Sequence, residues 1–336
     1  ASLEATGHGF KIIKEKEGVT VDYDKTVEQL YTYVTEKWNK KANIKLTATT
    51  TVSKPKYTTE DCEKVSNEPM GSYTTEFSVG SSYANRNLNI QNGAKLINGA
   101  VVYPGEQYSC NENLYPWTED NGWHPAGTYV DGGVQDSLGG GICQVSSTLY
   151  NALLRAEIKV VKRFPHSMAV GYVPLSADAA LAGDYKDLVF ENDTDAPIYV
   201  QGIYNSGGSI TFNIYGHDTR KAGHSVKYES KTVKTTPVKT QTKKDSSKPV
   251  GYSEVESSGH VGYVAELWKI TYENGKQVSK ELIHTSTYAM SPTIVVKGTK
   301  KASTTTKKDD SDKDDKKSSE KTTKKSTSSK KSKKSE

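Results

Sequence analysis

The sequence predicts an α+β protein with a central mixed α/β domain, an elongated all-β module and a disordered tail. Three observations predict this. A glycine-rich turn leads into an amphipathic segment that begins near Cys143, which predicts a Cys-bearing helix packed on an antiparallel sheet. Short β-forming runs dominate residues 216–300, and residues 301–336 are almost entirely Lys, Ser, Thr, Asp and Glu. The remaining chain divides into a small α+β segment, 1–75, and the central domain, 76–215.

Composition favours several small domains over one large core. Of the 336 residues, 34% are hydrophobic, and the mean hydropathy is −0.70. The net charge of +5 belongs to the tail, because Lys300–Glu336 holds 14 Lys against 7 acidic residues, a local charge of +7. Residues 1–299 therefore sum to about −2. A nucleic-acid-binding domain carries its basic patch on folded structure, so no nucleic-acid partner is predicted.

The chain contains no run of 18 apolar residues, so no membrane span is predicted. It begins with Ala1 rather than Met, which predicts an extracellular protein whose signal peptide or membrane anchor has been removed. The sequence has three cysteines and no Cys-x-x-Cys pair, so neither a metal site nor a cofactor is predicted. An odd number of cysteines outside a reducing compartment predicts one disulfide and one thiol kept for chemistry.

Residues 1–75 contain two predicted elements. Asp24 is placed to cap a helix that runs through Val34, because apolar residues recur there at three- and four-residue steps. The run from Asn43 to Val52 is rich in β-forming residues and predicts a strand.

Turn signals predict two strand pairs. Leu188–Phe190 and Ile198–Val200 flank the turn-forming residues 192–195, which predicts that the two strands pair with each other. Farther along, Tyr263–Tyr272 leads into Asn274-Gly275. That dipeptide is typical of a type I′ hairpin turn, because both central residues need positive φ.

Cys143 lies in the segment most informative about chemistry. Gly139–Gly141 precede it, and apolar side chains then recur on one helical face. A thiol at a helix N-terminus faces unpaired backbone N–H groups, which lower its pKa. Gly140 and Gly141 would let a substrate backbone approach, and their N–H groups would stabilise an oxyanion.

His166 follows about twenty residues later, in Arg163-Phe-Pro-His166-Ser167, just before a predicted strand at Met168–Val173. A Cys on a helix and a His on a strand is similar to the plan of papain-like and NlpC-type peptidases. The residues alone leave other interpretations open. A lone Cys at a helix start is usually a small buried apolar residue, the glycines are compatible with a packing turn, and His166 is compatible with the end of a strand.

Residues 76–215 resemble a VanW domain, a family of Gram-positive bacteria. The motifs that carry the resemblance are Asn89–Gly99, Pro104-Gly-Glu, Pro116-Trp-Thr118, Gly139–Ala152, Arg163-x-x-His166-Ser167, Asp178-Ala, Asp187-Leu-x-Phe190 and Asn192–Ile198. Cys110 departs from the residue expected at its position. Some clostridial members with this layout act as L,D-transpeptidases, so the resemblance implies a cysteine acyltransferase that forms 3-3 peptidoglycan cross-links.

In this interpretation Cys143 attacks a donor tetrapeptide stem, and the side-chain amine of a diamino acid on an acceptor stem resolves the thioester. His166 acts as general acid and base. Asp178 is expected to orient His166, with Asp187 as the alternative.

Four residues are expected to bind substrate: Gly140, Gly141, Arg163 and Ser167. Arg163 would pair with a stem carboxylate, or else form a surface ion pair. Two rival functions remain open. One is a hydrolase that uses the same Cys–His pair, and the other is a non-catalytic wall-binding protein with an inert thiol.

The flanking regions carry weaker resemblances. Residues 1–75 are similar to a peptidoglycan-binding-like segment. Residues 225–300 resemble the five-glycine (G-five) module, either a plain spacer or a binder of wall glycans, with the glycines Gly251, Gly259, Gly262, Gly275 and Gly298. The Lys-rich tail is expected to attract anionic wall polymers or simply to aid solubility.

Cys62 and Cys110 are predicted to form a disulfide that leaves Cys143 free. Two unpaired buried thiols are the alternative, because a bridge requires Cα atoms within about 7 Å.

Overall fold

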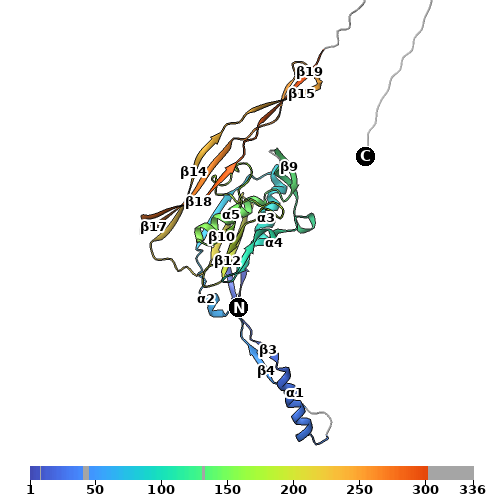
Figure 1. Ribbon diagram of the computed structural model, residues 1–336, viewed down its shortest axis with the longest axis vertical. Coiled ribbons are helices and arrows are strands. Elements are labelled where there is room, and N and C mark those ends of the chain that lie inside the picture. Colours follow the sequence, from blue (N-terminus) through green and yellow to red (C-terminus); the bar gives the residue numbers. More distant parts are fainter. Residues whose placement is uncertain (8, 41–44, 131–132, 302–336) are drawn as a thin grey trace, which may run out of the picture.

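The computed structural model describes residues 1–7, 9–40, 45–130 and 133–301 (Figure 1). A central α/β domain lies between an N-terminal arm at one end and a long β module at the other. Mixed α/β architecture with mostly antiparallel sheets, followed by a β-rich C-terminal part, is therefore confirmed. The predicted tail lies outside the described residues from 302 onward. Among the described helices, none is long and apolar enough to cross a membrane.

The central domain is built on a four-stranded antiparallel sheet in the order β5-β13-β12-β6. Its strands are β5 (Gly71–Glu76), β6 (Ala100–Val102), β12 (Ile198–Asn205) and β13 (Ser209–Tyr215). Two helices, α3 (Ala84–Ile97) and α5 (Ile142–Ala156), pack on one face. Gly202 allows this contact, because a Cβ there would lie 2.7 Å from the carbonyl oxygen of Ala94 in α3. The alternate residues of β12 and β13 that face the helices form the main core with them.

A second antiparallel sheet has the order β10-β11-β7. Its strands are β7 (Gln107–Ser109), β10 (Lys159–Lys162) and β11 (Val189–Glu191). The predicted pairing of 188–190 with 198–200 is wrong, because β11 pairs with β7 and β10 whereas β12 pairs with β6 and β13. Asn192 explains the error. Its buried side chain donates to the carbonyls of Val102 and Ala196, so the turn connects two sheets.

Several shorter elements surround these sheets. They are a hairpin, β8 (Pro125–Val130) with β9 (Gly133–Leu138), and the helices α2 (Thr59–Glu63), α4 (Cys110–Leu114), η2 (Ser81–Tyr83) and η3 (Glu119–Asn121).

The N-terminal segment has two parts. The hairpin β1 (Ser2–Thr6) and β2 (Gly9–Ile13) packs through Leu3 and Phe10 on Tyr199 and Tyr215, on the sheet face opposite the helices. The arm consists of β3 (Gly18–Val21), α1 (Tyr23–Thr32), the π-helical turn η1 (Tyr33–Lys37) and β4 (Thr50–Ser53).

The predicted N-terminal helix is present as α1, but its cap is Asp22, whose side chain accepts from the N–H of Lys25, and not Asp24. The predicted strand at 43–52 is correct at its end alone. Residues 45–49 are not strand, because Thr49 bonds to Asp22 and Thr26 at the helix start, and residues 43–44 lie outside the described chain.

The C-terminal module contains two three-stranded sheets. One has the order β14-β17-β18, and the other has the order β15-β19-β16, in which β15 and β19 are parallel. The strands are β14 (His224–Thr236), β15 (Thr240–Pro249), β16 (Ser253–Ser257), β17 (Gly262–Glu273), β18 (Lys276–Tyr288) and β19 (Thr293–Lys300). The predicted hairpin at Asn274-Gly275 is confirmed, with φ of 50° and 77° joining β17 to β18.

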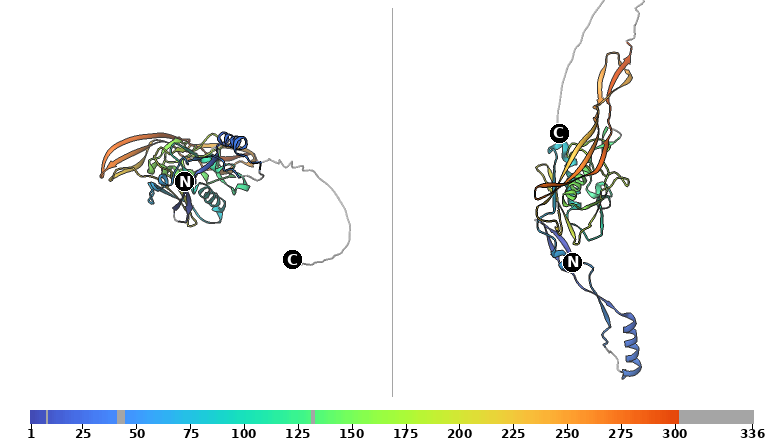
Figure 2. Two further views of the ribbon diagram at one scale, coloured as in Figure 1. Left: turned by 90° about the horizontal axis from the view of Figure 1, so that it is seen from below. Right: turned by 60° about the vertical axis from the view of Figure 1, so that its left-hand side comes forward.

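The sheet β14-β17-β18 lies against the central domain in every view (Figure 2). Leu267 of β17 is part of the main core, and the hydroxyl of Tyr228 donates to the carbonyl of Leu154 in α5. Glu157, just after α5, forms ion pairs with Lys269 (2.5 Å) and His224 (2.7 Å). Apolar burial and charge pairs therefore join the module to the domain.

The predicted Cys62–Cys110 disulfide is wrong. Both residues are free thiols with no exposed surface. Cys62 belongs to the small core under the N-terminal hairpin, whereas Cys110 belongs to the main core on the helix side of the sheet. Because the two thiols fill different cores, each acts as a small apolar side chain.

Candidate functional site

The turn before α5 fixes the position of Cys143. Gly139 and Gly141 have φ of 82° and 109°, a region that strains other residues. A Cβ on Gly140 would lie 2.5 Å from the carbonyl oxygen of Ala126. The side chain of Asn89 donates to the Gly140 carbonyl, holding the turn against α3. Helix α5 begins at Ile142, so Cys143 lies in its first turn.

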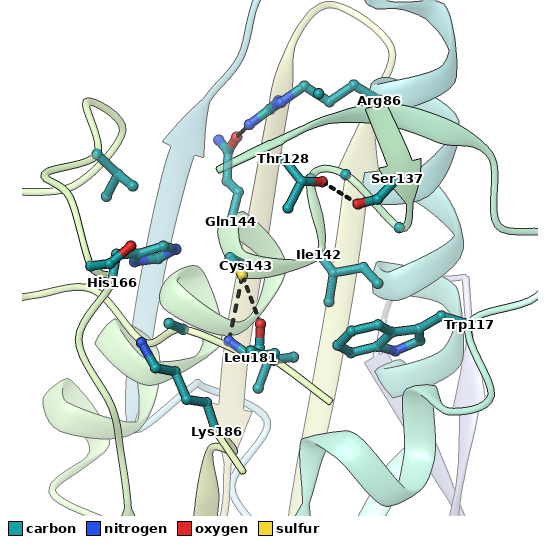
Figure 3. A pocket seen from close by; sticks show the side chains of 18 of the residues that line it. Arg86, Trp117, Thr128, Ser137, Ile142, Cys143, Gln144, His166, Leu181 and Lys186 are labelled. Atoms are coloured by element: carbon teal, nitrogen blue, oxygen red, sulfur yellow. Dashed lines mark hydrogen bonds between the residues drawn. The ribbon is translucent and has the colours of Figure 1, made fainter. Parts of the chain in front are cut away.

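Cys143 opens onto a cavity of about 580 Å³. Its Sγ lies 3.4 Å from both the N–H and the carbonyl oxygen of Leu181. His166 and Lys186 lie on one side of the thiol and Trp117 on the other (Figure 3). Gly140, Gly141 and Ser167 also line this cavity.

His166 lies in a loop that follows β10, and the predicted strand at 168–173 is wrong. The backbone of this loop bonds to the C-terminal module and not to a neighbouring strand of the central sheets. The Ser167 carbonyl accepts a hydrogen bond from the N–H of Ala289. His166 itself is held by Asp178. The Oδ2 atom of Asp178 lies 2.6 Å from Nδ1 of His166 and accepts from its backbone N–H at 2.7 Å.

Asp178 is fully buried, and its other oxygen is also engaged. Oδ1 accepts hydrogen bonds from Nη2 of Arg163 at 2.7 Å and from the hydroxyl of Tyr288 at 2.5 Å. The alternative residue, Asp187, accepts instead from the Ser109 hydroxyl and the N–H of Asn111 at the start of α4. The geometry therefore selects Asp178 as the partner of His166.

Electrostatics favours charge separation in this array. Burial opposes ionisation of Cys143, but hydrogen bonding and charge from His166, together with the N–H of Leu181, outweigh it and lower the pKa of the thiol. Burial likewise opposes the charged form of His166, yet Asp178 and Cys143 raise the pKa of the imidazole to about 9. Against burial, His166, Arg163 and Tyr288 hold the pKa of Asp178 below its usual range. Both shifts favour a thiolate facing an imidazolium over the neutral thiol and imidazole.

Arg163 does not have the predicted substrate-binding position. Its side chain is 7% exposed, and it donates to the carbonyl and carboxylate of Asp178 and to the hydroxyl of Ser286. Arg163 therefore pairs with a buried carboxylate of the same protein, and not with a stem carboxylate or in a surface ion pair. The motif spacing places Arg163 near His166, but the sequence does not indicate which way its guanidinium points.

Sequence reasoning missed several site residues. Arg86, Tyr172 and Lys186 line the cavity, and the Tyr172 hydroxyl lies 3.4 Å from Nε2 of His166. Nη2 of Arg86 donates to Gln144 at 2.6 Å. Tyr288, on β18, has no signal in the sequence that links it to Asp178, 110 residues earlier. Across the described part of the chain, no group of three or more His, Cys, Asp and Glu residues could hold a metal ion.

The fold and site define a chain in which an α/β domain with a Cys–His–Asp array at a cavity is joined to a β module. Comparison with known families gives the identity of both parts. Residues 85–215 match the family described as "VanW like protein", and residues 227–300 match the G5 domain. The chain therefore carries a VanW-like domain followed by a G5 domain, which confirms these two resemblances.

Two curated relatives are similar to this chain. "Uncharacterized protein YoaR" of Bacillus subtilis (strain 168) is 37% identical over 164 residues, covering 49% of this chain and 53% of the relative. "Vancomycin B-type resistance protein VanW" of Enterococcus faecalis (strain ATCC 700802 / V583) is 28% identical over 116 residues, covering 33% and 42%. The chain thus spans about half the length of these relatives.

Among solved structures, "IgA1 Protease G5 domain structure" is 30% identical, covering 24% of this chain and 96% of that one, with a TM-score of 0.19. "Crystal structure of HP0197-G5" is 23% identical, covering 22% and 97%, with a TM-score of 0.16.

Proposed function

We propose that this chain is an extracellular, cell-wall-associated L,D-transpeptidase that forms 3-3 peptidoglycan cross-links through a thioester on Cys143. The VanW-like and G5 domains support association with the bacterial wall. The observation that carries the catalytic part is the array itself. Cys143 opens onto a cavity, pairs electrostatically with His166, and Asp178 holds His166 from behind.

The reaction has two acyl-transfer steps. The Cys143 thiolate attacks the carbonyl carbon of the third residue of a donor tetrapeptide, so that a C–S bond forms and the C–N bond to the terminal D-Ala breaks. The imidazolium of His166 gives its proton to the leaving amine. The side-chain amine of a diamino acid on a second stem then attacks the thioester. His166 accepts the proton of that amine, a new C–N bond forms, and the thiolate is released.

The cavity wall suits an anionic peptide. Arg86 and Lys186 place positive charge in it, and a stem peptide ends in a carboxylate. Trp117 and Ile142 provide apolar surface nearby (Figure 3). The N–H of Leu181 already donates toward the sulfur, so it is close to where an oxyanion would develop.

The test uses purified protein, disaccharide-tetrapeptide fragments and mass spectrometry. A dimer formed with loss of one D-Ala is expected from the unaltered protein and from Cys62→Ala, whose thiol is remote and buried, but not from Cys143→Ala. Dimer formation by folded Cys143→Ala would refute the nucleophile assignment. Tripeptide monomer without dimer would instead point to the hydrolase, and intact fragments with folded protein would favour a wall-binding role.

A further inference from the structure

The C-terminal G5 module reaches the buried side of the Cys143–His166–Asp178 array. Tyr288 at the end of β18 is 2% exposed and places its hydroxyl between two groups of the central domain. That hydroxyl accepts from the N–H of Ser176 at 2.6 Å and donates to Oδ1 of Asp178 at 2.5 Å. Both bonds join residues more than a hundred positions apart, across the junction of the two domains.

The two oxygens of Asp178 have separate partners. Oδ2 accepts from the backbone and ring of His166, whereas Oδ1 accepts from Arg163 and Tyr288. A carboxylate bound on both oxygens has its plane fixed, and the plane decides whether Oδ2 points at Nδ1 of His166. Without Tyr288, Oδ1 would have Arg163 as its single donor. The guanidinium of Arg163 itself donates to the hydroxyl of Ser286 of the module at 2.8 Å.

A polar network behind Asp178 makes this contact rigid. Ser176 Oγ lies 2.8 Å from Ser286 Oγ and 3.1 Å from Nδ1 of His284, and Nε2 of His284 lies 2.8 Å from the Tyr150 hydroxyl on α5. His284, Ser286 and Tyr288 are spaced two positions apart on β18, so their side chains share one face of the sheet. The module therefore meets the site through a polar face of β18 and not through a linker.

We propose that Tyr288 is a positioning residue for the Cys143–His166–Asp178 array, so that the G5 module completes the catalytic site of the VanW-like domain. The role of the array in acyl transfer rests on the proposed function. The positioning itself concerns Asp178 and His166 and is testable without a wall substrate. The module then has a second task beside any contact with the wall, because it supplies a donor that the VanW-like domain lacks at this position.

The experiment compares Tyr288→Phe with Tyr228→Phe in the full chain. Each change removes one hydroxyl from the same module sheet, and each hydroxyl bonds to the central domain. Tyr228 donates at 2.7 Å to a backbone carbonyl in α5, away from Asp178. The readout is the pH dependence of the reaction of Cys143 with dipyridyl disulfide, a thiolate probe, with urea unfolding measured in parallel.

We expect Tyr288→Phe to shift the thiolate profile to higher pH and to slow the reaction near neutral pH by about tenfold, on the scale of one hydrogen bond to a charged group. Tyr228→Phe should lower stability to a similar extent and leave the profile unchanged. A Tyr288→Phe profile that superimposes on that of the unaltered protein, or an equal shift in both variants, would overturn the proposal. If the shift is present but no cross-linking is found, the proposed function fails while the positioning role stands.

Discussion

Replacing Asp178 by Asn removes one negative charge from behind His166 and nearly preserves the shape of the side chain. Burial disfavours the charged imidazole, and Asp178 and Cys143 together raise its pKa to about 9 from the ordinary 6.5. Without the Asp178 charge we expect this pKa to return toward 6.5. A full return to 6.5 would lower the protonated fraction near pH 7.5 from about 97% to about 9%, so the imidazolium population should fall by up to roughly tenfold, and the thiolate that it stabilises should fall with it.

Alkylation of Cys143 by iodoacetamide as a function of pH, followed by peptide mass spectrometry, measures this change. Cys62 and Cys110 do not compete near neutral pH, because burial raises the pKa of both thiols. Asp187→Asn is the matched control. Its carboxylate accepts hydrogen bonds from the Ser109 hydroxyl and from the N–H of Asn111 in the first turn of α4, so that variant should lose about 1 kcal/mol of stability and keep the alkylation profile.

The folding of Asp178→Asn needs its own control, since Arg163 would remain buried without its carboxylate. Breaking a buried pair on one side costs roughly 3–5 kcal/mol. The double variant Asp178→Asn, Arg163→Met removes the uncompensated charge, and urea unfolding shows which proteins are native. A folded Asp178→Asn variant with the unaltered profile would refute the reasoning, as would an equal shift in Asp187→Asn.

Two further predictions concern stability. Gly140→Ala should lower the free energy of unfolding by about 2 kcal/mol in urea titrations, because its Cβ meets the Ala126 carbonyl; unchanged stability would contradict the tight turn. The second concerns His284, whose pKa is lowered to about 4 by burial and by the charge of Arg163. Since its folded pKa lies below its unfolded pKa, its contribution to stability is complete above about pH 6.5 and is lost as the pH falls toward 4. His284→Gln should therefore flatten the stability curve between these pH values, and a curve of unchanged slope would exclude His284 as the cause.

A structural feature could be predicted from the sequence when neighbouring residues cause it. The start of α5 follows from neighbouring residues: glycines that adopt positive φ, then apolar side chains at helical spacing such as Val145 and Leu149. The hairpin at Asn274-Gly275 has an equally local cause. The pairing of strands, in contrast, depends on residues that are distant in the sequence. The side chain of Asn192 bonds to Val102 in β6, 90 residues away, so the turn between β11 and β12 is held by a contact that its own sequence does not indicate.

The same distinction applies to the site. Cys143 and His166 could be proposed from motifs, but both Asp178 and Asp187 follow His166 in the sequence, and both are candidates to orient it. Their roles differ because the loop after His166 bonds to the C-terminal module through Ser167, which brings Asp178 under the imidazole. Asp187 is drawn away by the N-terminus of α4. The position of Asp178 is thus tied to residues more than a hundred positions later, through the bonds of Tyr288 to Asp178 and of Ala289 to Ser167.

That dependence bears on how the two domains act together. A module that served as a spacer alone would gain nothing from a buried tyrosine hydroxyl and serine pointing into its neighbour, because unsatisfied polar groups at an interface cost stability. Here those groups are satisfied by the residues that hold His166: Tyr288 by Asp178, and Ser286 by Arg163. The polar atoms at the junction are thus matched to the array and not merely to each other. Loosening the junction should consequently affect the reactivity of Cys143 before it affects the fold of either domain.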